Sequence, residues 1–292
     1  MWFGSDLLDQ HLVLGSLKAL PWRITYQSLV QVQTFGGGND EWAQRLHDIS
    51  MVATQNFMDY CGTLPKEVFI EAHRAMLRQR LPLATTVGLH GMDQRFWEEV
   101  LLDPIPKSPP APIMVVFHFG WLPTVCTMAA AFGWRPTVLI NREEEGLFHK
   151  ALEYTSPTVD LETLSTGDVG VLIRAAQSLR RGRTLFIAAD VSAGQRTGGY
   201  AVDLPKGSIA LEDGPFQLAR MVGASVSAIA LQVRQPDSLS LQLSMTPAYL
   251  PDESPLPITR KFVQWLSDTP AQWLAWRYLT PIPQTIEEVH QS

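Results

Sequence analysis

The chain has 292 residues, of which 46% are hydrophobic and 18% are charged, and its formal net charge is −6. So apolar a chain can bury enough surface to offset the entropy lost on ordering it, which excludes an intrinsically disordered protein. The mild acidity argues against a protein that binds nucleic acid, because neutralising phosphates needs a concentrated basic face. Two cysteines, Cys61 and Cys126, cannot build a disulfide framework or a four-thiolate zinc site.

The first 102 residues are predicted to form a helical N-terminal region. Apolar residues recur there at helical spacing, which indicates helices over residues 8–20, 26–32, 40–61 and 65–77. For the first helix, which has Trp2 and Phe3 ahead of it, contact with a membrane surface is an alternative to core packing. Asp6 and Asp9 come early and no basic region precedes an apolar core, so we expect no secretory signal. The expected location is cytoplasmic, with peripheral contact with the inner membrane as the alternative.

Residues 103–112 contain five prolines, which cannot continue a helix and favour an extended chain. They are predicted to link the helical region to an α/β region over residues 113–292, and the three parts are expected to form one compact unit.

After this linker, short apolar runs alternate with segments of helical length. Strands are expected at residues 113–117, 137–140, 159–164, 184–189 and 225–233, with an edge strand at 238–246. Helices are expected at residues 145–154, 168–181, 212–222, 258–267 and 270–278. The alternation predicts an α/β fold with a largely parallel central sheet flanked by helices.

The 22 residues from Ile113 to Trp134 carry no formally charged side chain. A stretch of about 20 apolar residues is long enough to cross a bilayer. His118 and Pro123 lie in its interior, however, and a proline removes a backbone donor that hydrocarbon could not replace. We therefore interpret the stretch as a buried strand, a turn at residues 118–120 and an apolar helix over 121–132.

Polar side chains follow the ends of three predicted strands: His118, Arg142 and Asp190. Ligands bind beyond the carboxyl ends of strands in α/β sheets, because loops and helix N-termini converge there. A histidine in that position can act as a base near neutral pH. An aspartate can orient the base or bind a substrate hydroxyl, and an arginine can bind an anionic group with two hydrogen bonds. The structural alternatives are a packed histidine and an aspartate that caps a loop.

Other residues carry weaker signals. The remaining six histidines show no metal-ligand spacing, so no metal site is expected. Cys126, inside the apolar helix, is expected to be a buried and unreactive thiol. The cluster at residues 180–183, Arg-Arg-Gly-Arg, is interpreted as a solvated helix end, with contact with an acidic partner as the alternative.

Several motifs follow one another in a recognisable order. They are a strand followed by His118-Phe119-Gly120 and Trp121, a strand ending at Asn141-Arg142, a helix leading through Gly182 to a strand that ends at Asp190, and the blocks at 203–207, 214–219, 223–224 and 269–277. In this order and spacing, residues 113–277 resemble the late acyltransferases of lipid A biosynthesis, the lauroyl/myristoyl acyltransferase family of the lysophospholipid acyltransferase-like superfamily.

The resemblance implies transfer of an acyl group from a thioester, carried by acyl carrier protein or coenzyme A, to a hydroxyl group. In the family, a histidine paired with an acid five residues later deprotonates the acceptor. Here the fifth residue after His118 is Pro123, and no carboxylate lies between His118 and Glu143. Losing the orienting acid of such a pair can slow a reaction by about 10⁴. Either another carboxylate, Asp190 first, supplies the role, or the acceptor is an amine that needs less activation, or transferase chemistry has been lost.

The function expected from the sequence is therefore an acyltransferase with a thioester co-substrate and no bound cofactor. Phe119 and Trp121 are expected to line the acyl groove, and Arg142 to bind an anionic part of the donor or acceptor. Family members are typically basic and membrane-anchored, whereas this chain has a sequence pI of about 5.6, so lipid A is not the expected acceptor. A non-catalytic partner that binds an acyl carrier, and a hydrolase that releases the acyl group from its thioester, are the alternatives.

Overall fold

The structure is a computed structural model that describes residues 16–35, 40–119, 122–140, 160–190, 199–235 and 239–279. Within this part of the chain, the centre is a six-stranded sheet with strand order β3-β2-β4-β1-β7-β8. The strands are β1 (Ile113–Val116), β2 (Pro136–Ile140), β3 (Glu162–Ser165), β4 (Thr184–Ala188), β7 (Val226–Gln235) and β8 (Ser240–Met245). All neighbours pair in parallel except β7 and β8, which are antiparallel. The predicted α/β fold with a largely parallel sheet is confirmed.

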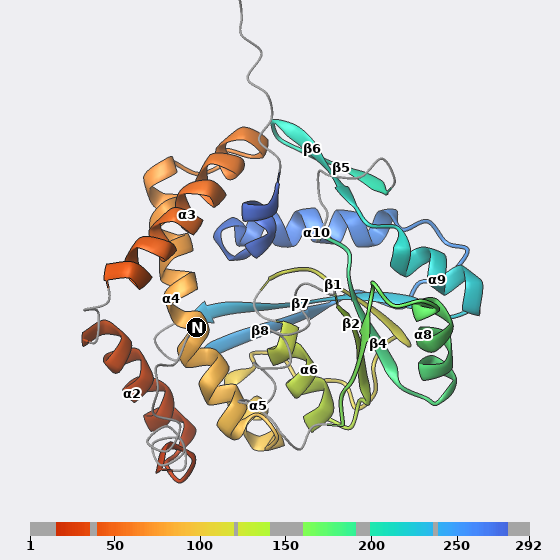
Figure 1. The fold of residues 1–292 in the computed structure, drawn as a ribbon, viewed down its shortest axis with the longest axis horizontal. Coiled ribbons are helices and arrows are strands. Elements are labelled where there is room, and N and C mark those ends of the chain that lie inside the picture. Colours follow the sequence, from red (N-terminus) through yellow and green to blue (C-terminus); the bar gives the residue numbers. More distant parts are fainter. Residues whose placement is uncertain are drawn as a thin grey trace, which may run out of the picture.

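Helices cover both faces of the sheet (Figure 1). The helices are α2 (Trp22–Phe35), α3 (Asp40–Tyr60), α4 (Lys66–His90), α5 (Gln94–Val100), α6 (Leu122–Ala131), α8 (Val171–Arg180), α9 (Gly214–Val222) and α10 (Leu256–Asp268). Ile113 and Val115 of β1 share a core with α8, α9 and α10. Met114 and Val116 point to the other face, where they join α4, α5 and α6. Because both faces are buried, β1 is apolar at every position instead of alternating.

The charge-free stretch divides as expected. Its first part is β1, and its later part is α6, which has Pro123 in its first turn, where a proline costs no helical hydrogen bond. None of the described helices is both long and apolar enough to cross a membrane.

The N-terminal helices pack against the end of the described chain. There, two short 3₁₀ turns, η1 (Pro270–Gln272) and η2 (Leu274–Tyr278), lie beside α3 and α4. The side-chain amide of the buried Asn56 on α3 donates hydrogen bonds to the carbonyls of Trp276 and Leu279, at 2.7 and 2.9 Å. These bonds fix η2 to α3.

Some elements differ from the sequence-based expectation. Residues 270–278 were predicted to be one helix and instead form η1 and η2. Helix α4 runs past the expected end at residue 77 to His90, although Pro82 lies within it, because the core takes up Leu83 and Val87. An antiparallel hairpin of β5 (Tyr200–Leu204) and β6 (Gly207–Leu211) was not predicted. The helices expected at residues 8–20 and 145–154 lie largely or wholly outside the described residues.

Candidate active site

The carboxyl ends of β1 and β4 bring His118 and Asp190 together. The two strands are parallel neighbours, and Val116, the last residue of β1, pairs in register with Ala188, the last residue of β4. His118 and Asp190 each follow two residues later. Equal offsets beyond paired strands place the two side chains at the same edge of the sheet, where ligands bind in α/β folds.

The two side chains form a close hydrogen-bonded pair. His118 Nδ1 lies 2.6 Å from Asp190 Oδ1, and the backbone N–H of His118 donates to Asp190 Oδ2 at 2.8 Å. The carboxylate is fully buried, whereas the imidazole keeps 20% of its surface exposed. A proton on Nδ1 satisfies the carboxylate and leaves the ring's lone pair on Nε2. The arrangement fixes both the tautomer and the orientation of the imidazole, as a base requires.

Trp273 completes the surroundings of Asp190. Its indole Nε1–H donates to Asp190 Oδ2 at 2.6 Å. A buried charge is costly unless it is hydrogen-bonded, and this carboxylate receives three such bonds. Sequence reasoning gave Trp273 no role, although the block at 269–277 was among the motifs of the resemblance.

The same C-terminal segment holds the turn that carries His118. The backbone N–H of Leu274 donates to the carbonyl of His118 at 2.9 Å, and Phe119 forms an isolated antiparallel bridge with Trp273. The indoles of Trp273 and Trp276 then meet edge to face, with centroids 4.7 Å apart. Trp276 in turn meets Phe57 of α3 at 5.4 Å. A continuous row of aromatic rings thus ties the pair to the N-terminal helices.

Of the three other predicted site residues, the structure describes Phe119 but not Trp121 or Arg142. Phe119 is 1% exposed and packs with Phe262 and Trp265, at centroid distances of 6.1 and 6.5 Å. Its ring is therefore part of the core, and a contact with the acyl chain stays a prediction. Arg142 and Trp121 lie outside the described residues.

Within the described part of the chain, we find neither a metal-binding cluster nor a reactive thiol at Cys126. No group of three or more His, Cys, Asp and Glu within it is placed to hold a metal ion. Cys126 is fully buried, and burial raises the pKa of its thiol, so it is protonated at neutral pH. This agrees with the interpretation of Cys126 as an unreactive thiol.

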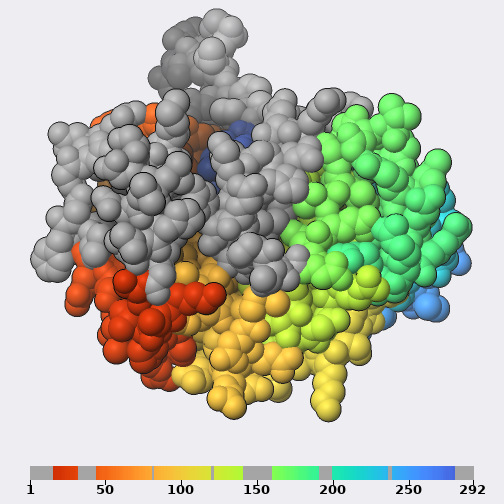
Figure 2. Space-filling view, turned by 60° about the horizontal axis from the view of Figure 1, so that its bottom comes forward, coloured from red at the N-terminus to blue at the C-terminus, as the bar shows by residue number. Residues whose placement is uncertain are grey.

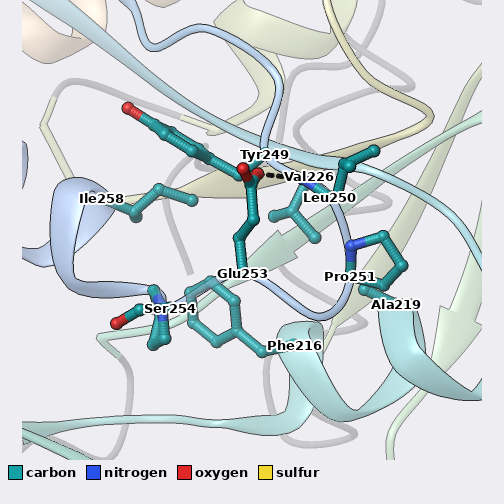
Figure 3. Close-up of a pocket in the computed structure, with 10 residues that line it drawn as sticks. Phe216, Ala219, Val226, Tyr249, Leu250, Pro251, Glu253, Ser254 and Ile258 are labelled. Atoms are coloured by element: carbon teal, nitrogen blue, oxygen red, sulfur yellow. Dashed lines mark hydrogen bonds between the residues drawn. The ribbon is translucent and has the colours of Figure 1, made fainter.

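Figure 3 shows a small hollow in the described part of the chain. Its lining includes Phe216, Tyr249 and Ile258, and its volume of about 10 Å³ has room for about one water molecule. Val226, the first residue of β7, also lines it, so the hollow lies at the amino end of the parallel strands. It is too small for an acyl chain and lies at the opposite end of the strands from His118.

No protein-family model matches the chain, and a search of the curated proteins gives no match. The resemblance to the late acyltransferases therefore stays a prediction.

Proposed function

We propose that the protein is an acyltransferase in which His118 is the general base and Asp190 is the residue that positions it. One observation carries the proposal: the 2.6 Å contact between His118 Nδ1 and Asp190 Oδ1 at the carboxyl edge of the sheet. A partly exposed imidazole backed by a buried carboxylate is the arrangement that activates a hydroxyl group in other base–orienter pairs.

The proposed reaction moves one acyl group and one proton. His118 Nε2 takes the proton from the acceptor's hydroxyl or amine as its oxygen or nitrogen attacks the thioester carbonyl carbon. Asp190 stabilises the imidazolium that forms, without itself becoming protonated. The carbon–sulfur bond then breaks, and His118 returns the proton to the departing thiolate. The products are the acylated acceptor and the free thiol of acyl carrier protein or coenzyme A.

The geometry also accounts for the acid missing after His118. Pro123, in the family's acid position, is buried in the first turn of α6. The carboxylate instead reaches the imidazole from the end of the neighbouring strand β4. An apolar surround would have favoured the non-catalytic alternative, and a carboxylate in hydrogen-bonding contact favours retained base chemistry.

The proposal includes the donor and the place of reaction. The donor is an acyl thioester of carrier protein or coenzyme A, and the acceptor is a hydroxyl or amine compound other than lipid A. We place the reaction in the cytoplasm, where both thioesters occur. The acidic composition of the chain supports an acceptor that is not held at an anionic membrane surface.

The test is a turnover assay with the full-length protein. Acyl-coenzyme A and acyl-carrier-protein thioesters of several chain lengths are incubated with pools of hydroxyl and amine acceptors, and products are followed by mass spectrometry. His118→Ala is compared with the wild type and with His90→Ala, which removes a partly buried histidine at the end of α4. Circular dichroism checks that each variant is folded.

We expect acylated product from the wild type and His90→Ala, and a loss of at least 10³-fold in His118→Ala. Equal product from His118→Ala would remove His118 from the mechanism. Free fatty acid without an added acceptor would identify a thioester hydrolase instead. Tight binding of a carrier without any turnover would identify a non-catalytic partner.

A further inference from the structure

An open cleft lies between helix α10 and the chain that leaves the edge strand β8. Its volume is about 410 Å³, within the range of about 300 to 1,000 Å³ that is typical of small-molecule sites. Two segments line it, one from the end of β8 onwards and one on α10: Met245, Thr246, Pro247 and Tyr249, and Pro257, Arg260, Lys261 and Gln264. Because neither His118 nor Asp190 lines the cleft, it is separate from the candidate active site.

The spacing of residues along α10 directs its polar face to the cleft. Pro257, Arg260, Lys261 and Gln264 follow one another at intervals of one, three or four residues, which places them on one side of the helix. The buried residues of α10 lie on its other side, in the core. The amphipathic pattern that anchors α10 to the sheet therefore also presents two basic side chains to the cleft.

The cleft is positively charged. Lys261 Nζ donates to Gln264 Oε1 at 2.9 Å and lies 5.9 Å from the ring centroid of Trp265, which holds the ammonium group on this side of α10. Arg260 is exposed and forms no ion pair with another described residue. None of the residues that line the cleft is acidic. A chain with a net charge of −6 thus places two cations in one cleft without a carboxylate.

Other arginines of the same chain show what internal pairing looks like. Arg183 is 7% exposed and bonds Asp160 at 2.8 Å, and Arg181 beside it pairs with Glu162 at 2.6 Å. The cluster at residues 180–183, interpreted from sequence as a solvated helix end, is therefore largely a structural ion network. The cations of the cleft have no such carboxylates around them.

The wall opposite the cations is largely apolar. It consists of Met245, Pro247 and the ring of Tyr249, whose backbone is fixed to Val226 by hydrogen bonds of 2.8 and 2.9 Å. Figure 3 shows the ring of Tyr249 directed away from Leu250, on the neighbouring hollow. Because the backbone holds Tyr249 in place, its ring is a fixed surface on which an apolar group can pack.

We propose that this cleft binds a small phosphate monoester, with the phosphate between Arg260 and Lys261 and the organic group against Tyr249 and Pro247. A phosphate monoester carries a charge of about −1.5 to −2 at pH 7, which matches two cations, whereas a carboxylate would neutralise only one. Arginine binds phosphate oxygens with two parallel hydrogen bonds, and lysine adds a compact charge. The inference does not depend on the proposed acyl transfer.

The position of this part of the chain leaves room for a ligand to approach. In Figure 2 the light-blue atoms, which come from the chain near residue 250, reach the surface at the right-hand edge of the molecule. The red N-terminal helix lies at the opposite side of that view. A ligand in the cleft therefore has no need to displace the N-terminal helices.

The first experiment measures binding of phenyl phosphate to the full-length protein by calorimetry. We expect saturable binding to the wild type, and a loss of about tenfold or more in each of Arg260→Gln and Lys261→Gln, because each removes a hydrogen bond between charged groups. Arg220→Gln, at an exposed arginine of α9 outside the cleft, is the matched control and should bind like the wild type. Circular dichroism checks that each variant is folded.

The second experiment separates the parts of the ligand. Inorganic phosphate should bind more weakly than phenyl phosphate, and Tyr249→Ala should reduce the difference between them. Benzoate, with one charge, should bind more weakly than phenyl phosphate. Equal affinities for benzoate and phenyl phosphate would overturn the assignment to a phosphate.

Two outcomes would overturn the site itself. One is the absence of saturable binding of phenyl phosphate to the wild type, and the other is equal binding to the wild type and to the double variant of Arg260→Gln and Lys261→Gln. His118→Ala should bind like the wild type, and loss of binding in that variant would place the ligand at the candidate active site instead. Because these measurements need no turnover, failure of the acyl-transfer proposal is seen separately.

Discussion

Two polar clusters lie on either side of η2, one around Asp190 and one around His73, and they differ in whether the buried group is charged. At the edge of the sheet, Asp190 receives three hydrogen bonds and faces one imidazole. Between α4 and η2, the buried His73 lies against Phe69 and Ser50, and burial, followed by the nearby charges of Arg277 and Arg80, lowers its pKa to about 4, so its ring is neutral. The hydrogen bonds of the first cluster are all formed without a ligand, as the proposed base–orienter pair requires. The second keeps a histidine uncharged because the ring is buried and cations are nearby.

The largest effect is expected at the cluster around Asp190. Asp190→Asn removes the charge that stabilises the imidazolium and favours the wrong tautomer of His118. By analogy with other base–orienter pairs, kcat should fall by about 10³ to 10⁴, with little change in KM. Steady-state kinetics measures both. Asp252→Asn, at an exposed aspartate, is the control and should keep wild-type kinetics; an unchanged kcat in Asp190→Asn would contradict the positioning role.

Phe57 supports both clusters at once, so its loss should damage them together. Its ring is fully buried, stacks on Phe69 at 4.0 Å and meets the edge of Trp276. Phe57→Ala should lower the free energy of unfolding by about 3 to 5 kcal/mol, measured by urea denaturation. Val52→Ala, at a position of α3 that is 49% exposed, should cost less than about 0.5 kcal/mol. Equal costs at the two positions would mean that the aromatic row does not hold η2.

The buried His73 makes stability depend on pH. The pKa of His73 is lowered from 6.5 to about 4 in the folded protein, so the unfolded chain binds the extra proton first as the pH falls. The contribution of neutral His73 to the free energy of unfolding is fully present above pH 6.5. It is lost progressively as the pH falls to about 4. The loss attributable to this group is at most about 3.5 kcal/mol. Denaturation of the wild type and of His73→Gln at pH 7 and 4.5 measures it, and parallel pH dependences would refute the assignment.

Trp273 should give the smallest of these effects. Trp273→Phe keeps an aromatic ring but removes the 2.6 Å bond to Asp190. One lost hydrogen bond to a charged group costs about 1.5 to 3 kcal/mol, so kcat should fall by roughly tenfold or more while the KM for the donor is unchanged. A rise in KM with constant kcat would show that Trp273 contacts substrate instead of positioning Asp190.

Local patterns in the sequence were enough to predict the core of the fold and the two residues, His118 and Asp190, that the structure brings together. The apolar run of β1, and the polar His118 and the proline Pro123 within the charge-free stretch, predicted the strand, turn and helix that present His118. Its position at a strand end indicated Asp190. The sequence could not decide among three explanations for the missing acid, because strand order determines whether the ends of β1 and β4 are neighbours. The role of Trp273 depends on its hydrogen bond to Asp190, a contact between distant segments that no spacing reveals.

The central claim is that His118 and Asp190 act as one unit, and a double-mutant cycle tests it most directly. The rate of acyl transfer is measured for His118→Ala, Asp190→Asn and the double variant, with folding checked by circular dichroism. If Asp190 acts only through His118, the double variant is no slower than His118→Ala. If the losses of the two single variants multiply instead, the residues work independently, and the account of the site is wrong.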